Sequence, residues 1–228
     1  MLVVLTNQQD EAAINLANRW KSQDVYVLTP EGLSVSGWRY EMPSGCSRAV
    51  IGGREIAPEE ITGVLTRMPC VSEQDLDHFM PDDRAYAASE MTAFLLAWLS
   101  GLTCPMLNRP VPGCLSGPSL RTEQWVRLAG RLGIPACPVH RKTPQDSTPP
   151  LPTAEVVVIG DRCVGAVDPV LAGHARMLAQ AAGVELLLVY FSSPKRGGRL
   201  VNASLWPDLW QSDVVDAILD YFQRRAKC

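Results

Sequence analysis

A strand, helix and strand pattern within the first 28 residues constrains the fold more than any other feature of the chain. Residues 2–5 are a short apolar run typical of a buried strand, and residues 25–28 are a second one. The intervening residues 10–21 have an amphipathic helical pattern, with Asp10 at the N-cap position. Such a unit pairs its strands in parallel through a right-handed crossover. We therefore predict an open α/β sheet at the N-terminus.

The turn after the first predicted strand excludes one common class of ligand. It reads Thr6-Asn7-Gln8-Gln9 and lacks the glycines of the GxGxxG turn that binds dinucleotides. Neither a Walker phosphate loop nor a GxSxG nucleophile elbow occurs elsewhere. The formal net charge is −3, and basic residues alternate with acidic ones, so we expect no nucleic-acid partner. No standard motif assigns a reaction, and no catalytic residue is predicted.

The seven cysteines and three histidines are scattered along the chain. No two cysteines have CxxC spacing, and a tetrahedral zinc site needs clustered thiolates or imidazoles, so no metal site is predicted. An odd number of cysteines without a secretory signal indicates reduced thiols. The longest apolar run, residues 94–102, is too short to span a bilayer. We therefore expect a cytoplasmic protein with no membrane partner.

The first half of the chain contains further strand patterns and one long helix pattern. The predicted helix covers residues 82–100, and its apolar stripe could face the sheet, which is the default, or a second subunit in a homodimer. The stripe consists of Ala85, Ala88, Thr92, Leu95 and Leu99. Strands are predicted at residues 32–38, with 48–51 as the antiparallel partner, and at 61–66 and 105–107.

The second half is divided from the first by a crossing near residue 117, which predicts domains at 1–117 and 118–228. Residues 142–153 are rich in proline and carry no apolar pattern, as expected of a linker. Two hairpins are predicted, one around Gly160 and one around residues 194–198, where Gly197 and Gly198 would supply positive φ angles. Helices are predicted at residues 119–132, at 169–182 and from 212 onward.

Several segments, in order, resemble the ATP-grasp ligases that act on peptides or amino acids. These ligases include the ribosomal-protein glutamate ligase, the glutathione synthetases and the enzymes that macrocyclise microviridin-type peptides. The matching segments are ITGVLTRMP, YAASEMTAFLLAWLSGL, CPMLNRPVP, SLRTEQWVRLAGRLGIPACP, EVVVIGDRCVGAV and LAQAAGVELLLVYFSSPKRGGRLVNASLWPDL, which together span nearly the whole chain. The resemblance implies an N-terminal open, Rossmann-like sheet and a C-terminal α+β remnant of the ATP-grasp core.

Two departures from this family imply that ATP-dependent activity is lost. The family has a nucleotide-clamping lid between its linking helix and its late hairpin, where this chain has only the linker at 142–153. The family also places an acidic residue in the strand aligned with residues 184–191 and a Glu-x-Asn pair in the last strand. Here the first strand has Val189-Tyr190 at the acidic position, and the second has Leu200-Val201-Asn202, in which only the asparagine is retained. One neutral amide cannot hold a magnesium ion.

The candidate ligand-binding residues are cationic or amide side chains near strand ends and turns. Arg67 follows a core strand and could bind a carboxylate or phosphate, or form a structural ion pair. Lys195 and Arg196 could line a backbone nest for an anion, or simply occupy an exposed turn. Trp206 and Trp210 are interpreted as core or interface anchors, with an aromatic platform as the alternative. The full set is Arg67, Asn108, Arg109, Arg121, Lys195, Arg196 and Asn202.

These observations favour a non-catalytic protein that binds a partner protein, a peptide or a small acidic ligand. The resemblance implies an accessory role in peptide or natural-product maturation, without a cofactor. One alternative is an active carboxylate–amine ligase that uses Mg-ATP. The other is a structural homodimer subunit that associates through the helix at 82–100.

Overall fold

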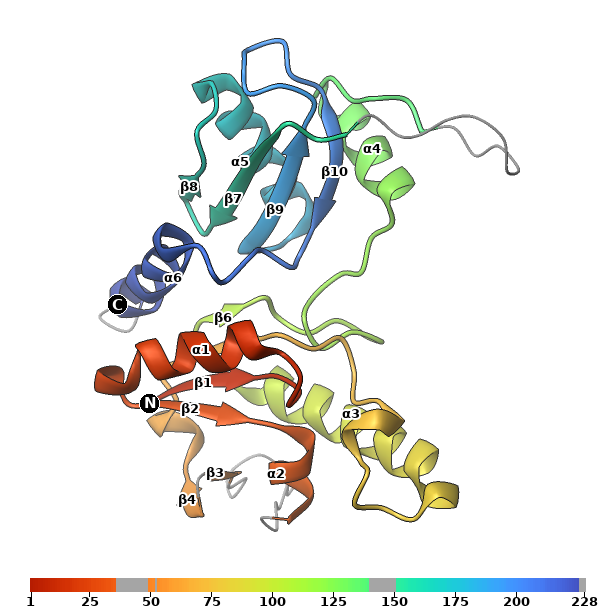
Figure 1. The fold of residues 1–228 in the computed structure, drawn as a ribbon, viewed down its shortest axis with the longest axis vertical. Helices are drawn as coiled ribbons and strands as arrows, with labels where there is room; N and C mark the ends of the chain where they lie inside the picture. The colour runs from red at the N-terminus through yellow and green to blue at the C-terminus, as the bar shows by residue number, and fades with distance from the viewer. Residues whose placement is uncertain (36–48, 52, 140–150, 226–228) are drawn as a thin grey trace. The chain divides into compact units, whose positions relative to one another are not determined.

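The computed structural model describes residues 1–35, 49–51, 53–139 and 151–225 of the 228-residue chain (Figure 1). These residues form two compact units, and the first runs from Met1 to Gly117 and also includes the end of the chain from Phe222. The second unit runs from Pro118 to Tyr221. One unit contains a parallel sheet and the other an antiparallel sheet, which confirms the predicted α/β class.

The first unit is built on a four-stranded parallel sheet with the strand order β2-β1-β5-β6. Helix α1 connects its two N-terminal strands, so the predicted β-α-β unit is confirmed. Asp10 caps that helix, because its carboxylate accepts a hydrogen bond from the Ala13 amide at 3.0 Å. The elements are β1 (Leu2–Leu5), α1 (Glu11–Arg19), β2 (Val25–Leu28), β5 (Gly63–Thr66) and β6 (Met106–Leu107).

The strand predicted at residues 32–38 is wrong, because residues 30–35 form the short helix α2 (Pro30–Val35). Thr29 starts this helix, since its hydroxyl accepts a hydrogen bond from the Gly32 amide at 3.2 Å. Pro30 and Leu33 are buried at a three-residue spacing that suits a helix. Residues 36–38 lie outside the described part. Strand β3 (Ala49–Ile51) instead forms an antiparallel hairpin with β4 (Arg54–Ile56).

Helix α3 (Arg84–Gly101) confirms the long helix predicted at residues 82–100. Its buried side chains are Ala88, Leu95, Trp98 and Leu99, which pack with Val3 and other apolar residues of the parallel sheet. Ala85, predicted to belong to the same stripe, is exposed. The described residues of this unit also form the short 3-10 helices η1 (Lys21–Gln23), η2 (Pro58–Glu60), η3 (Glu73–Asp75) and η4 (Pro81–Asp83).

The second unit contains an antiparallel sheet with the strand order β10-β9-β7-β8. Helices α4 and α5 cover one face of this sheet (Figure 1), where Trp125 and Phe191 lie among the buried residues. The two predicted hairpins are confirmed, because β7 pairs with β8 and β9 pairs with β10. The elements are α4 (Thr122–Arg131), β7 (Ala154–Ile159), β8 (Arg162–Val164), α5 (Pro169–Ala182), β9 (Leu186–Phe191), β10 (Leu200–Ser204) and α6 (Ser212–Arg225).

Three other sequence predictions meet the structure at particular residues. Trp206 and Trp210 are 38% and 59% exposed, which disfavours the core and leaves the interface anchor and the aromatic platform as the alternatives. The predicted linker lies outside the described residues up to position 150, and its last residue, Thr153, donates its hydroxyl to the Ser192 carbonyl at 2.8 Å. Within the described part of the chain, no helix has both the length and the apolar character needed to cross a membrane.

Candidate ligand-binding sites

Buried polar side chains gather at the carboxyl ends of the parallel strands in the first unit. Thr6 follows β1, Thr66 ends β5 and Asn108 follows β6, and each is at most 4% exposed. Leu5 pairs with Thr66 and Leu65 pairs with Leu107, so these ends lie at one level of the sheet. Open α/β sheets bind their ligands at this edge. We call these residues, with Asp10 and Arg67, the carboxyl-edge site.

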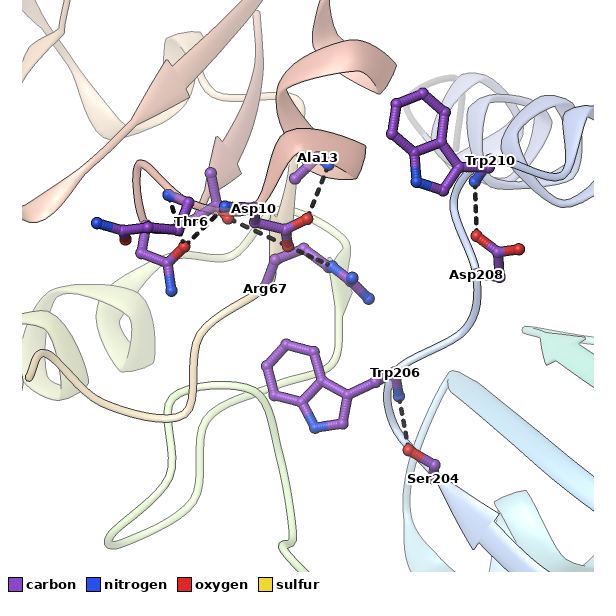
Figure 2. A network of polar contacts seen from close by, with 10 residues as sticks. Thr6, Asp10, Ala13, Arg67, Ser204, Trp206, Asp208 and Trp210 are labelled. Carbon is purple, nitrogen blue, oxygen red and sulfur yellow. Dashed lines mark hydrogen bonds and ion pairs between the residues drawn. The ribbon is translucent and has the colours of Figure 1, made fainter.

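An ion pair between Arg67 and Asp10 fixes the centre of the carboxyl-edge site. Arg67 Nε donates to Asp10 Oδ2 at 3.1 Å, and the two side chains are 10% and 15% exposed. Figure 2 shows the Thr6 hydroxyl donating to the same oxygen, at 3.4 Å, while Asp10 Oδ1 caps α1. The alternative of a structural ion pair for Arg67 therefore has direct geometric support. Asp10 was identified from the sequence only as a cap.

Thr66 ends β5 with an unsatisfied group on the sheet face that Leu5 and Val64 share, opposite the face of Arg67. Its side chain is 4% exposed, and among the described residues its hydroxyl has no hydrogen-bond partner. A buried polar group without a partner costs about 1–3 kcal/mol, so a ligand group that pairs with it gains that much more by binding. Sequence reasoning missed Thr66, although a threonine that ends a buried strand on this edge could have indicated it.

Asn108 and Arg109 follow the same strand but have different surroundings. Asn108 is 3% exposed and stays at the carboxyl edge. Arg109 instead donates to the carbonyl oxygens of Leu102 and Cys104, at 3.1 and 3.0 Å. Its guanidinium thus ties together the connection between α3 and β6. This geometry gives Arg109 a structural role in that connection.

Arg121, Lys195 and Arg196 belong to the second unit. Arg121 precedes α4, where its amide donates to Gln124 Oε1 at 2.8 Å, and it lines a shallow surface hollow. In the β9–β10 turn, the amide of Lys195 donates to Ser193 Oγ at 3.2 Å. The Gly198 amide donates to the Lys195 carbonyl at 2.7 Å. A backbone nest for an anion would need these amides, and both are used within the turn.

The two glycines of the β9–β10 turn do not serve the role predicted for them. Neither Gly197 nor Gly198 has a positive φ angle, so backbone conformation does not require glycine there. A Cβ atom at position 198 would lie 2.3 Å from the Ser193 carbonyl oxygen, whereas nothing lies within 4 Å at position 197. Gly198 is therefore required by close approach of the backbone.

Asn202 forms a polar row with two residues of the adjoining strands in the second unit. It pairs with Tyr190 of β9, which in turn pairs with Glu155 of β7. The row lies on the face opposite α4 and α5, because Val156, Val189 and Ala203 next to these residues pack under those helices. Asn202 Oδ1 is buried and has no partner among the described residues. We call Glu155, Tyr190 and Asn202 the polar row.

The polar row contains one carboxylate and two neutral groups. Burial, and secondly the charge of Glu155, raises the pKa of Tyr190, so its phenol is neutral at physiological pH. In the described ranges, no three His, Cys, Asp or Glu side chains come close enough to hold a metal ion. The trio therefore presents acceptors and a hydroxyl instead of a set of anionic metal ligands.

Comparisons with known proteins show similarity in structure only. No protein-family model matches the chain, and neither does any curated protein sequence. The macrocyclase MdnC of Microcystis aeruginosa, solved with precursor peptide MdnA, has a TM-score of 0.72 at 10% identity, over 98% of this chain and 99% of that one.

Two more solved structures agree with this result. The macrocyclase MdnB of the same organism has a TM-score of 0.66 at 14% identity, over 97% of this chain and 98% of that one. A RiPP-associated ATP-grasp ligase of Chryseobacterium gregarium, solved with ADP and a leader and core peptide, has a TM-score of 0.67 at 8% identity, over 98% and 96%. This chain therefore has the fold of the ATP-grasp ligases.

Proposed function

We propose that this chain binds a peptide as an accessory protein in peptide maturation and does not ligate it with ATP. The fold supports the peptide half of this proposal, because structures that share it were solved with a precursor peptide or with a leader and core peptide. The side chains at the expected metal position in the second unit support the other half, the absence of ligation with ATP. The peptide would be bound here and modified by a separate enzyme.

The residues at the expected metal position do not fit Mg-ATP, and this observation carries the proposal. Magnesium prefers anionic oxygens in near-octahedral geometry. Tyr190, a neutral phenol, lies where the resemblance implies an acid. Leu200, at the position of the family's glutamate, is fully buried under α4 and α5, because a register shift separates it from Asn202. Even a carboxylate at position 200 would thus face away from the polar row.

The connection between α4 and β7 also supports loss of nucleotide binding. Its described residues, 132–139 and 151–153, contain neither a helix nor a named strand, only a single bridge from Ala136 to Leu200. The remaining positions, 140–150, are too few for the sheet and helices of a nucleotide lid. A bound nucleotide would therefore lack its clamp as well as its metal ligands.

The carboxyl-edge site supplies groups that suit a peptide. Its guanidinium, held by Asp10, is a donor for carboxylate or carbonyl oxygens. The buried hydroxyl of Thr66 needs a partner that the described part of the protein does not provide. Peptide backbones offer both donors and acceptors at regular spacing, so they can satisfy such groups.

Thermal unfolding with millimolar Mg-ATP tests the catalytic half of the proposal. A ligand at a hundredfold excess over its dissociation constant stabilises by about 2.7 kcal/mol, which raises the midpoint by about 5 to 10 °C for a chain of this size. We expect no shift. A magnesium-dependent shift would support the alternative of an active carboxylate–amine ligase and overturn the proposal.

Selection from a displayed random peptide library tests the binding half, with Thr66→Val as the site variant. The variant removes a hydroxyl without a described partner, so stability should hold or rise while affinity for selected peptides falls by about tenfold. Thr62→Val is the matched control, because its hydroxyl donates to the Met1 carbonyl at the opposite, amino-terminal end of β5, and it should cost about 1 kcal/mol without affecting binding. If no peptide is enriched and the protein's molecular mass in solution rises with its concentration, the structural homodimer explains the protein better.

A further inference from the structure

The polar row faces away from the core of the second unit and has unused hydrogen-bonding capacity. Glu155 is exposed, Tyr190 is partly buried, and the oxygen of Asn202 is buried. Within the described chain, no hydrogen bond is made by the side chains of these three residues. The row thus has a solvated charge at Glu155 and, at Asn202, a buried acceptor that lacks a donor. An unsatisfied buried acceptor is costly unless a ligand supplies the hydrogen.

The chemistry of the row selects for a cation. Two of its members are acceptors, and the single formal charge is the carboxylate of Glu155, which repels phosphate and attracts a positive group. The phenol of Tyr190 lies between them with an aromatic face that favours cations. A hydrogen-bond donor that carries positive charge would satisfy Asn202 Oδ1 and pair with Glu155 together.

The spacing of the row favours a guanidinium over an ammonium ion. Adjacent strands lie about 4.8 Å apart, so Glu155 and Asn202 flank Tyr190 at about that distance on either side. A guanidinium has five donors in a planar fork, and it can stack on an aromatic ring while donating in two directions. The ammonium of lysine is a compact charge that would reach one flank only.

We propose that the polar row binds an arginine side chain of a peptide ligand, at the position where the resemblance implies metal-bound phosphates. The guanidinium enters from the exposed side at Glu155 and passes over Tyr190 toward Asn202. This inference rests on the proposed function for the source of the arginine. The row's preference for a guanidinium rests only on the three side chains and their register.

Carbon-13 NMR of tyrosine-labelled protein tests this inference with a small probe. The chain has five tyrosines, and Tyr190→Phe identifies the resonance of Tyr190. Nα-acetyl-arginine methylamide should shift that resonance saturably, at about millimolar concentration as expected for a ligand of its size. Nα-acetyl-citrulline methylamide, a neutral analogue of the same shape, should shift it far less.

Charge variants make the test specific to the row. Glu155→Gln should lower the affinity for the arginine probe by about tenfold, because a charge-assisted hydrogen bond is lost. Glu59→Gln removes an exposed carboxylate of the first unit and should leave the titration unchanged. Both positions are exposed, so neither variant endangers folding.

The probe also separates this inference from the proposed function. Equal shifts with citrulline, no effect of Glu155→Gln, or a magnesium-dependent shift of the Tyr190 resonance by ADP would overturn the guanidinium site. None of these results depends on whether a longer peptide binds at the carboxyl edge. Failure of the peptide selection with a normal arginine titration would instead refute the peptide and leave the guanidinium site standing.

Discussion

Asp10 should contribute to stability in two separable ways, and a pair of substitutions distinguishes them. Its Oδ1 caps α1 through the Ala13 amide, and its Oδ2 pairs with Arg67 Nε at 3.1 Å. Asp10→Asn keeps a capping oxygen but loses the charge, whereas Asp10→Ala loses both. The comparison therefore isolates the ion pair from the cap.

The expected magnitudes follow from burial. Removal of one partner of a buried pair costs about 3–5 kcal/mol, and with side chains 10% and 15% exposed we expect about 2–4 kcal/mol for Asp10→Asn. Asp10→Ala should cost about 1 kcal/mol more, since an aspartate cap is lost. In a double-mutant cycle, Arg67→Gln should show a coupling of about 1–3 kcal/mol with Asp10→Asn.

Urea denaturation followed by circular dichroism gives these free energies by linear extrapolation. Thr92→Val, which loses hydrogen bonds with the Val71 amide and the Ala88 carbonyl, is the additive control, because neither bond involves Asp10 or Arg67. Equal losses for Asn and Ala at position 10 would refute the capping role. A coupling below about 0.3 kcal/mol would show that the pair does not act as a unit.

Three further predictions concern other described residues. Cys70 is exposed, whereas burial shields Cys104 and raises the pKa of its thiol, so in single-cysteine variants a disulfide reagent at pH 8 should modify Cys70 more than about tenfold faster. The pKa of Tyr190 is raised in the folded state, so the stability should be unaffected below about pH 10 and should fall as the pH rises through the folded pKa. Urea titrations at pH 9 and pH 11 measure this loss, and Tyr190→Phe should remove the part that Tyr190 causes. Gly198→Ala should lower the unfolding free energy by about 1–3 kcal/mol, because its Cβ meets the Ser193 carbonyl, while Gly197→Ala should have no measurable effect.

Local patterns predicted most of the elements because each depends on residues close in sequence. The cap at Asp10 and the bounds of α5 follow from short-range periodicity and side-chain chemistry. Residues 32–35 fit the strand predicted at 32–38 because their alternation is also compatible with one helical turn that has two buried positions. The N-terminal cap by Thr29 favours the helix over the strand, and a prediction from hydrophobic periodicity alone does not take this cap into account.

The candidate sites were only partly predictable, since they depend on register between distant strands. The sequence places Arg67 at a strand end, but not the carboxylate of Asp10 beside it. The resemblance placed Val189 and Tyr190 at the position of an acidic metal ligand and Asn202 at the position of the family's asparagine. Only the pairing of β7 with β9 adds Glu155 to the same row, and a one-residue slip would have moved it to the opposite face.

The carboxyl-edge site and the polar row suit different groups of a ligand. The carboxyl-edge site presents a guanidinium and an unsatisfied hydroxyl, which suit the oxygens of a peptide. The polar row presents acceptors beside one carboxylate, which suit a cationic side chain. A magnesium–nucleotide complex would meet a single carboxylate at the row, too little charge to hold a divalent ion that bridges phosphates. Each site, taken by itself, suits groups that an arginine-containing peptide offers and that Mg-ATP does not, which favours peptide binding and disfavours ligation with ATP.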